Sequence, residues 1–176
     1  TMVAFNKNNG QLIWATESLG GKNGYVSPVL VEHNGRKMII GVTSDYILGV
    51  NPADGTILWR FKYVDVGTPD TEHSRRQNNT VSPFYHDGFV YVTSGYDHVG
   101  AKLKLNEAGT DVELIWTDSV MDVHHGGVVL VEDAVDSRHA GGRGDWWLVD
   151  IRRELQSGCA RHGRAVRRFQ LLNGRW

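Results

Sequence analysis

The apolar residues of the first 131 positions come in short runs that are separated by turn dipeptides. Residues 38–44 and 89–94 are two such runs, and each follows a turn pair, Asn34-Gly35 or Asp87-Gly88. Both positions of an Asn-Gly or Asp-Gly pair tolerate a positive φ, which the tight two-residue turn of a β-hairpin requires. No stretch here keeps a 3.6-residue period, so the pattern predicts an all-β fold of short antiparallel strands.

Two segments repeat without gaps, residues 4–14 and residues 49–59. They share the pattern small-x-Asn-x-x-(Asn/Asp)-Gly-x-aliphatic-aliphatic-Trp at a period of 45 residues. A second hairpin follows Val-Ser-Pro at residues 26–28 and again at residues 81–83. Each unit therefore holds about four strands, which is the sequence pattern of a β-propeller blade.

A third unit is longer than the first two. Residues 99–105 and 112–116 predict two strands around a turn, and Trp116 closes the unit 57 residues after Trp59. The added residues lie mainly in a polar segment, residues 63–79. Residues 126–131 open a further unit, so the sequence predicts three to four blades.

The (Ala/Gly)-x-Asn-x-x-x-Gly-x-x-x-Trp repeat resembles that of the PQQ-like β-propeller family, over roughly residues 1–131. That family includes quinoprotein alcohol dehydrogenases and a non-enzymatic outer-membrane assembly lipoprotein. The resemblance implies a ring of seven or eight blades, of which we expect this chain to be a fragment. It also implies a periplasmic or extracellular location and a blade-docking role for three tryptophans, Trp14, Trp59 and Trp116.

The pattern fades after Val131, and we expect a partial propeller over residues 1–151 followed by a basic tail over residues 152–176. The tail holds seven arginines and one acidic residue, Glu154, without a clear period of 2 or 3.6. Three interpretations stay open: a disordered basic tail, a translation artefact such as a frameshift, or an arginine-rich segment that binds nucleic acid or anionic lipid. No aromatic residues interleave the arginines, which argues against base stacking.

Composition excludes several classes of protein. The 176 residues carry 20 acidic and 19 basic side chains, a formal charge of −1, which argues against nucleic acid as the partner of the whole chain. No apolar run approaches the ~18 residues of a membrane helix. The single cysteine, Cys159, forms no internal disulfide and belongs to no zinc pattern.

The densest polar cluster of the repeat region lies in the long segment before the third unit. It offers His73, Arg75, Arg76 and Asn78 as ligand-binding candidates. Adjacent arginines can clamp a carboxylate or a phosphate through paired hydrogen bonds. The alternative is a solvated loop that only connects two blades.

Two further clusters lie at strand ends, where we expect the rim of the propeller. Tyr96, Asp97 and His98 form one, and His124 and His125 lie in the other. A carboxylate beside a histidine can orient a general base. Neighbouring side chains of an extended chain point to opposite faces, so we predict no metal site at the two adjacent histidines. The alternative for both clusters is a hydrogen-bonded loop or a contact between blades.

The leading hypothesis is a ligand- or partner-binding propeller domain without a catalytic set, whose channel or rim binds a protein, a glycan or a small molecule. No cofactor is firmly implied. The alternative is a quinoprotein dehydrogenase that oxidises alcohols or sugars. Resemblance to those enzymes would imply PQQ in the central channel and calcium held by Glu, Asn and Asp side chains. No such set can be matched to this sequence, and the repeat tryptophans occupy structural positions.

Overall fold

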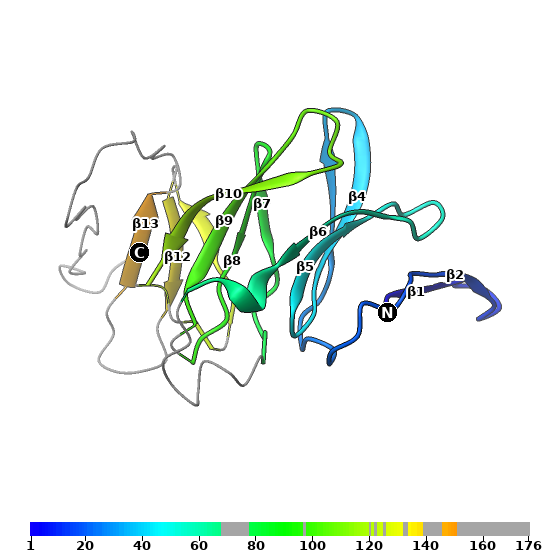
Figure 1. The fold of residues 1–176 in the computed structure, drawn as a ribbon, viewed down its shortest axis with the longest axis horizontal. Helices are drawn as coiled ribbons and strands as arrows, with labels where there is room; N and C mark the ends of the chain where they lie inside the picture. The colour runs from blue at the N-terminus through cyan, green and yellow to red at the C-terminus, as the bar shows by residue number, and fades with distance from the viewer. Residues whose placement is uncertain are drawn as a thin grey trace, which may run out of the picture.

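The computed structural model describes residues 1–67, 78–96, 98–119, 121, 123–124, 126–131, 134–138 and 146–150. These residues form a series of antiparallel sheets, and the sheets follow one another across the molecule in chain order (Figure 1). Every sheet is built from strands that are consecutive in the sequence. This arrangement matches the predicted repetition of short hairpins, in which the strands of each unit pair with one another.

The first two sheets contain the two gap-free repeats. The first sheet pairs β1 (Val3–Phe5) with β2 (Leu12–Ala15). The second has the order β3-β4-β5-β6, with β3 (Val29–His33), β4 (Arg36–Val42), β5 (Tyr46–Val50) and β6 (Ile57–Lys62). A single turn of 3-10 helix, η1 (Tyr63–Asp65), follows β6.

The third sheet also has four strands, in the order β10-β9-β8-β7. Its strands are β7 (Phe84–His86), β8 (Phe89–Val92), β9 (Gly100–Leu105) and β10 (Val112–Asp118). Four strands per unit and an all-β fold are therefore confirmed for the second and third units. Among the described residues, no helix has the length and apolar character needed to cross a membrane.

The fourth sheet extends the pattern beyond the point where the sequence signal fades. It consists of β11 (Val129–Val131), β12 (Ala134–Arg138) and β13 (Trp146–Asp150). β12 pairs with β11 on one side and with β13 on the other. The sequence pattern predicted the start of this unit but not β12.

The two hairpin turns named above adopt the predicted backbone. Asn34 and Gly35 have φ angles of 49° and 79°, and Asp87 and Gly88 have φ angles of 45° and 79°. Two successive positive φ angles give the turn a twist that matches the flanking strands. The turns therefore fix the β3–β4 and β7–β8 registers, which end at His33–Arg36 and His86–Phe89.

The largest core lies between the second and third sheets. Its buried side chains include Met38, Ile40 and Trp59 from the second sheet and Val90 and Leu103 from the third. Smaller clusters continue the packing on either side. One gathers Trp14 with Leu48 and Val50, and the other gathers Val81, Tyr91, Met121 and Val123. Consecutive sheets thus bury apolar faces against each other, as stacked repeat units do.

Several predictions fall outside the described residues. They concern the candidate ligand-binding residues His73, Arg75, Arg76, Asp97 and His125, together with Cys159 and the whole tail, residues 152–176.

Candidate functional site

Two of the predicted clusters meet in the structure. Tyr96, in the turn after β8, brings its hydroxyl within 2.8 Å of Nε2 of His124, in the connection before β11. Their ring centroids lie 4.0 Å apart in an edge-to-face arrangement. The hydroxyl of Thr80 donates a hydrogen bond to the backbone carbonyl of His124. These contacts join the third sheet to the segment that leads into the fourth.

His98 does not join this pair, although it lies two residues from Tyr96. Its ring packs edge-on against Tyr63 with centroids 4.5 Å apart, and its Nδ1 lies 3.1 Å from the carbonyl oxygen of Val99. A carbonyl can only accept, so Nδ1 carries the hydrogen. Burial lowers the pKa of His98, while the hydrogen bond to Val99 opposes that shift. The site therefore favours a neutral imidazole that holds a loop in place.

His124 has a counterpart one unit earlier. His124 lies five residues before β11, and Asn79 lies five residues before β7. The Asn79 side chain donates to the carbonyl of Thr43 in the turn after β4, and its backbone carbonyl accepts from Tyr25. Both residues thus reach back to the turn of the preceding sheet. Half-buried Asn78 lies in the same segment. This repetition supports the predicted alternative, a contact between blades, over a general base at His124.

His33 is the residue that the sequence analysis missed. It is 7% exposed at the end of β3. Its Nε2 lies 2.8 Å from the carbonyl oxygen of Asn106, and its Nδ1 lies 3.1 Å from the hydroxyl of Tyr85. Asn34 adds a hydrogen bond of 3.0 Å to the carbonyl of Glu107. The second sheet therefore holds the third through its β3–β4 turn.

A signal for His33 was present in the sequence. Side chains alternate between the two faces of a strand, so His33 points to the same face as Val29 and Val31. That face packs against the core between the sheets. A histidine that continues an apolar face indicates a buried ring with satisfied nitrogens, even though its partners lie more than 50 residues away.

The three repeat tryptophans make three different contacts. Trp14 donates from Nε1 to the carbonyl of Pro52, 2.9 Å away in the second sheet. Trp59 is buried in the core between the second and third sheets. Its Nε1 has no hydrogen-bond partner among the described residues. Trp116 stacks on Tyr91 at a centroid distance of 6.5 Å. The Trp14 contact is the one that directly bonds one sheet to the next.

Tyr91 belongs to a buried polar group on the far side of the third sheet. Its hydroxyl donates to Oδ2 of Asp118 over 2.8 Å, and the backbone amide of Met121 donates to the same oxygen over 3.1 Å. Burial raises the pKa of Tyr91, and the negative charge of Asp118 adds to the shift. The tyrosine is therefore a fixed hydrogen-bond donor and not an acid.

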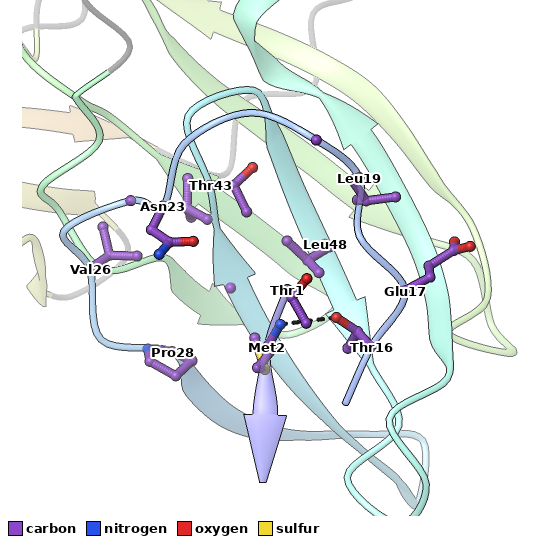
Figure 2. A pocket seen from close by; sticks show the side chains of 14 residues that line it. Thr1, Met2, Thr16, Glu17, Leu19, Asn23, Val26, Pro28, Thr43 and Leu48 are labelled. Carbon is purple, nitrogen blue, oxygen red and sulfur yellow. Dashed lines mark hydrogen bonds between the residues drawn. The ribbon is translucent and has the colours of Figure 1, made fainter. Parts of the chain in front are cut away.

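Two of the hollows on the described part of the chain lie at junctions between sheets. The smaller, about 170 Å³, lies between the first two sheets. Thr1, Met2 and Thr16 line it with Thr43 and Leu48 from the second sheet, and the amide of Met2 donates to the Thr16 hydroxyl (Figure 2). It carries one acidic side chain, that of Glu17.

The larger hollow, about 430 Å³, lies where three turns of the second and third sheets converge. We call it the inter-sheet cleft. Its lining residues are Glu32, His33, Asn34, Tyr85, Asp87, Gly88, Lys104, Leu105 and Glu107. None of the predicted ligand-binding residues lies in it. No group of three or more His, Cys, Asp or Glu side chains suited to a metal ion occurs in the described ranges.

Comparisons with known proteins agree with this architecture. The family model for outer membrane protein assembly factor BamB matches residues 1–152. In the crystal structure of BamB from Moraxella catarrhalis, a matching region covers 85% of this chain and 39% of that one, with a TM-score of 0.54 and 17% identity. The chain thus spans well under half the length of that β-propeller. A search of curated proteins found no significant match. The predicted propeller fold and PQQ-like repeats are confirmed, and the chain belongs to the family of the outer membrane protein assembly factor BamB.

Proposed function

We propose that this chain is a protein-binding part of a propeller that takes part in outer membrane protein assembly. The family match over residues 1–152 carries the proposal. That family description favours a protein over a glycan or a small molecule as the partner. It also supports the expectation of a periplasmic location, in contact with the outer membrane.

The use of polar side chains in the fold supports the same proposal. His33, Asn79 and His124 hold consecutive sheets together, so their hydrogen-bonding groups serve the scaffold. Function in such a scaffold is then expected on loops and turns at its surface. The inter-sheet cleft is a hollow formed between such turns.

The quinoprotein alternative requires a calcium ligand set and a pocket for the quinone. In the part of the chain that the structure describes, no three histidine, cysteine or carboxylate side chains are placed so that they could hold a metal ion. The described residues therefore do not fit calcium, and no step of an oxidation is assigned to them.

The test compares binding with turnover on the same preparation. Purified chain is mixed with purified components of the outer membrane protein assembly machinery, and complex formation is measured by sedimentation velocity. The same chain is then supplied with PQQ, calcium and a dye acceptor, across alcohols and aldoses. We expect a complex and no dye reduction. Turnover without a complex would contradict the proposal.

A further inference from the structure

We propose that the inter-sheet cleft binds a basic, arginine-bearing segment of a partner protein. The inference rests on the proposed function in taking a protein as the partner, and it adds where that protein docks and which chemistry is recognised. The cleft's shape, its fixed walls and its unpaired carboxylates carry the inference.

The cleft is a surface that only the association of two sheets creates. Glu32 and Asn34 come from the β3–β4 turn region, Asp87 from the β7–β8 turn and Glu107 from the β9–β10 turn. Its volume of about 430 Å³ falls within the range of pockets that enclose a ligand group, about 300–1,000 Å³. It therefore has room for a large side chain with part of its backbone.

The walls of the cleft are held by hydrogen bonds that cross between the sheets. His33 bonds Asn106 and Tyr85, and Asn34 bonds the carbonyl of Glu107. The amide of Gly88 lies 3.3 Å from the Tyr85 hydroxyl and can donate to it. These bonds fix the turns before any partner arrives, which reduces the entropy lost on binding.

The charge of the lining favours a cation. Three carboxylates, those of Glu32, Asp87 and Glu107, share the cleft with the ammonium of Lys104, so three negative charges and one positive charge leave −2. Among the described residues, the ion pairs within 4.0 Å involve none of these four side chains. Lys37 lies opposite Glu32 in the β3–β4 register without forming such a pair. The carboxylates are thus available to an external cation.

Arginine fits this lining better than a small cation does. A planar guanidinium can bond a carboxylate through two parallel N–H groups and can lie against an aromatic ring. Tyr85 and Leu105 supply an aromatic and an aliphatic surface for the stem of the side chain. Exposed ion pairs are individually weak and screened by salt, so binding should be modest and should weaken as ionic strength rises.

The test uses a fluorescein-labelled Gly-Ser peptide with two arginines, measured by fluorescence anisotropy at low and at physiological ionic strength. A peptide with citrulline in place of arginine removes the charge and keeps the shape. Spermidine is titrated as a competitor, because a free polyamine offers cationic charge without a peptide. The cleft variant is Glu32→Gln, Asp87→Asn and Glu107→Gln, in which asparagine still tolerates the positive φ of position 87.

A matched control variant changes three exposed acidic residues outside the cleft, Glu17→Gln, Asp65→Asn and Glu113→Gln. Both variants change the formal charge by the same +3. We expect the cleft variant to weaken peptide binding about 10-fold and the control variant at most about 2-fold. Thermal denaturation confirms that both variants fold.

Three results would overturn the inference: equal weakening by both variants, no binding of the arginine peptide by the unchanged chain, or displacement by spermidine at concentrations equal to the peptide. Failure here is distinguishable from failure of the proposed function. If the chain still forms a complex with assembly proteins after the cleft substitutions, the proposed function stands and the proposed binding site in the cleft is wrong. If the peptide binds but no such complex forms, the binding site stands and the proposed function is wrong.

Discussion

His33 shows how a single polar residue joins two sheets. Its ring is buried, and both nitrogens face fixed partners on the third sheet. Because the Asn106 carbonyl only accepts, Nε2 carries a hydrogen, and Nδ1 shares a hydrogen bond with the Tyr85 hydroxyl. A buried polar group contributes little net energy when paired, but leaving its partners unpaired is costly.

Replacing His33 with phenylalanine tests this contact. His33→Phe keeps an aromatic ring but leaves the Asn106 carbonyl and the Tyr85 hydroxyl without this partner. We expect a loss of about 1–3 kcal/mol in the free energy of unfolding, measured by urea denaturation. His86, the last residue of β7, is exposed and provides the control, His86→Phe. Similar losses for the two variants would contradict a bridging role for His33.

His98 gives the fold a dependence on pH. Burial lowers its pKa in the folded state, so the unfolded chain binds the proton more readily. Its contribution to stability is therefore complete above the unfolded value of about 6.5 and is lost as pH falls below it. Urea denaturation between neutral pH and pH about 5 should show falling stability, with a smaller slope in His98→Phe. An unchanged slope in that variant would contradict this assignment.

The backbone at Gly49 lies close to the ring of Trp59. It pairs with Trp59 across β5 and β6, and a Cβ atom at position 49 would lie 2.2 Å from Trp59 Nε1. Gly49→Ala should destabilise the fold by about 1–3 kcal/mol, because a buried indole has no room to move. Exposed Gly127 has no atom within 4 Å of its added Cβ, so Gly127→Ala is the control in thermal denaturation. A neutral Gly49→Ala would show that the ring adjusts freely.

At the level of elements, two tryptophans at equivalent repeat positions should behave differently. The indole N–H of Trp14 bonds the Pro52 carbonyl of the second sheet, whereas that of Trp59 has no described partner. Both rings are buried. Phenylalanine removes the N–H from either ring, so Trp14→Phe should cost about 0.5–1.5 kcal/mol more than Trp59→Phe. Urea denaturation of the two variants measures the difference, and equal costs would contradict the contact.

The strands of the first three sheets were predictable because local chemistry specifies them. Asn34-Gly35 and Asp87-Gly88 set the turns, and the apolar runs on either side set the strands. β12 was not predictable in the same way, because no Asn-Gly or Asp-Gly pair stands on either side of it. Its strand character is specified by pairing with β11 and β13, and strand preference depends strongly on such neighbours.

The candidate site was predictable only in part. Tyr96 and His124 were chosen for their residue types, and the structure brings them together, but the contact joins two sheets. The inter-sheet cleft went unrecognised because its carboxylates, on Glu32, Asp87 and Glu107, come from three separate segments of the chain. Nothing in the sequence shows that these segments converge until the second sheet packs on the third.

At the scale of the whole molecule, consecutive sheets pack face to face and are tied by side chains that reach from one unit to the next. This is the arrangement of a propeller, and the chain spans 39% of the BamB propeller from Moraxella catarrhalis. Because the packing and the bonds between the sheets hold the turns together, the cleft that they form is preorganised for a partner.

Site-specific photo-crosslinking in cells decides whether this face of the propeller binds a protein of the assembly machinery. The photoreactive residue is placed at Glu107 in one variant and at Glu113 in the other. Both positions are exposed, Glu107 within the β9–β10 turn and Glu113 in β10, but only Glu107 lines the cleft. We predict crosslinks to an outer membrane assembly protein from position 107 and not from position 113. Crosslinks from neither position, or equally from both, would contradict binding of such a protein at the inter-sheet cleft.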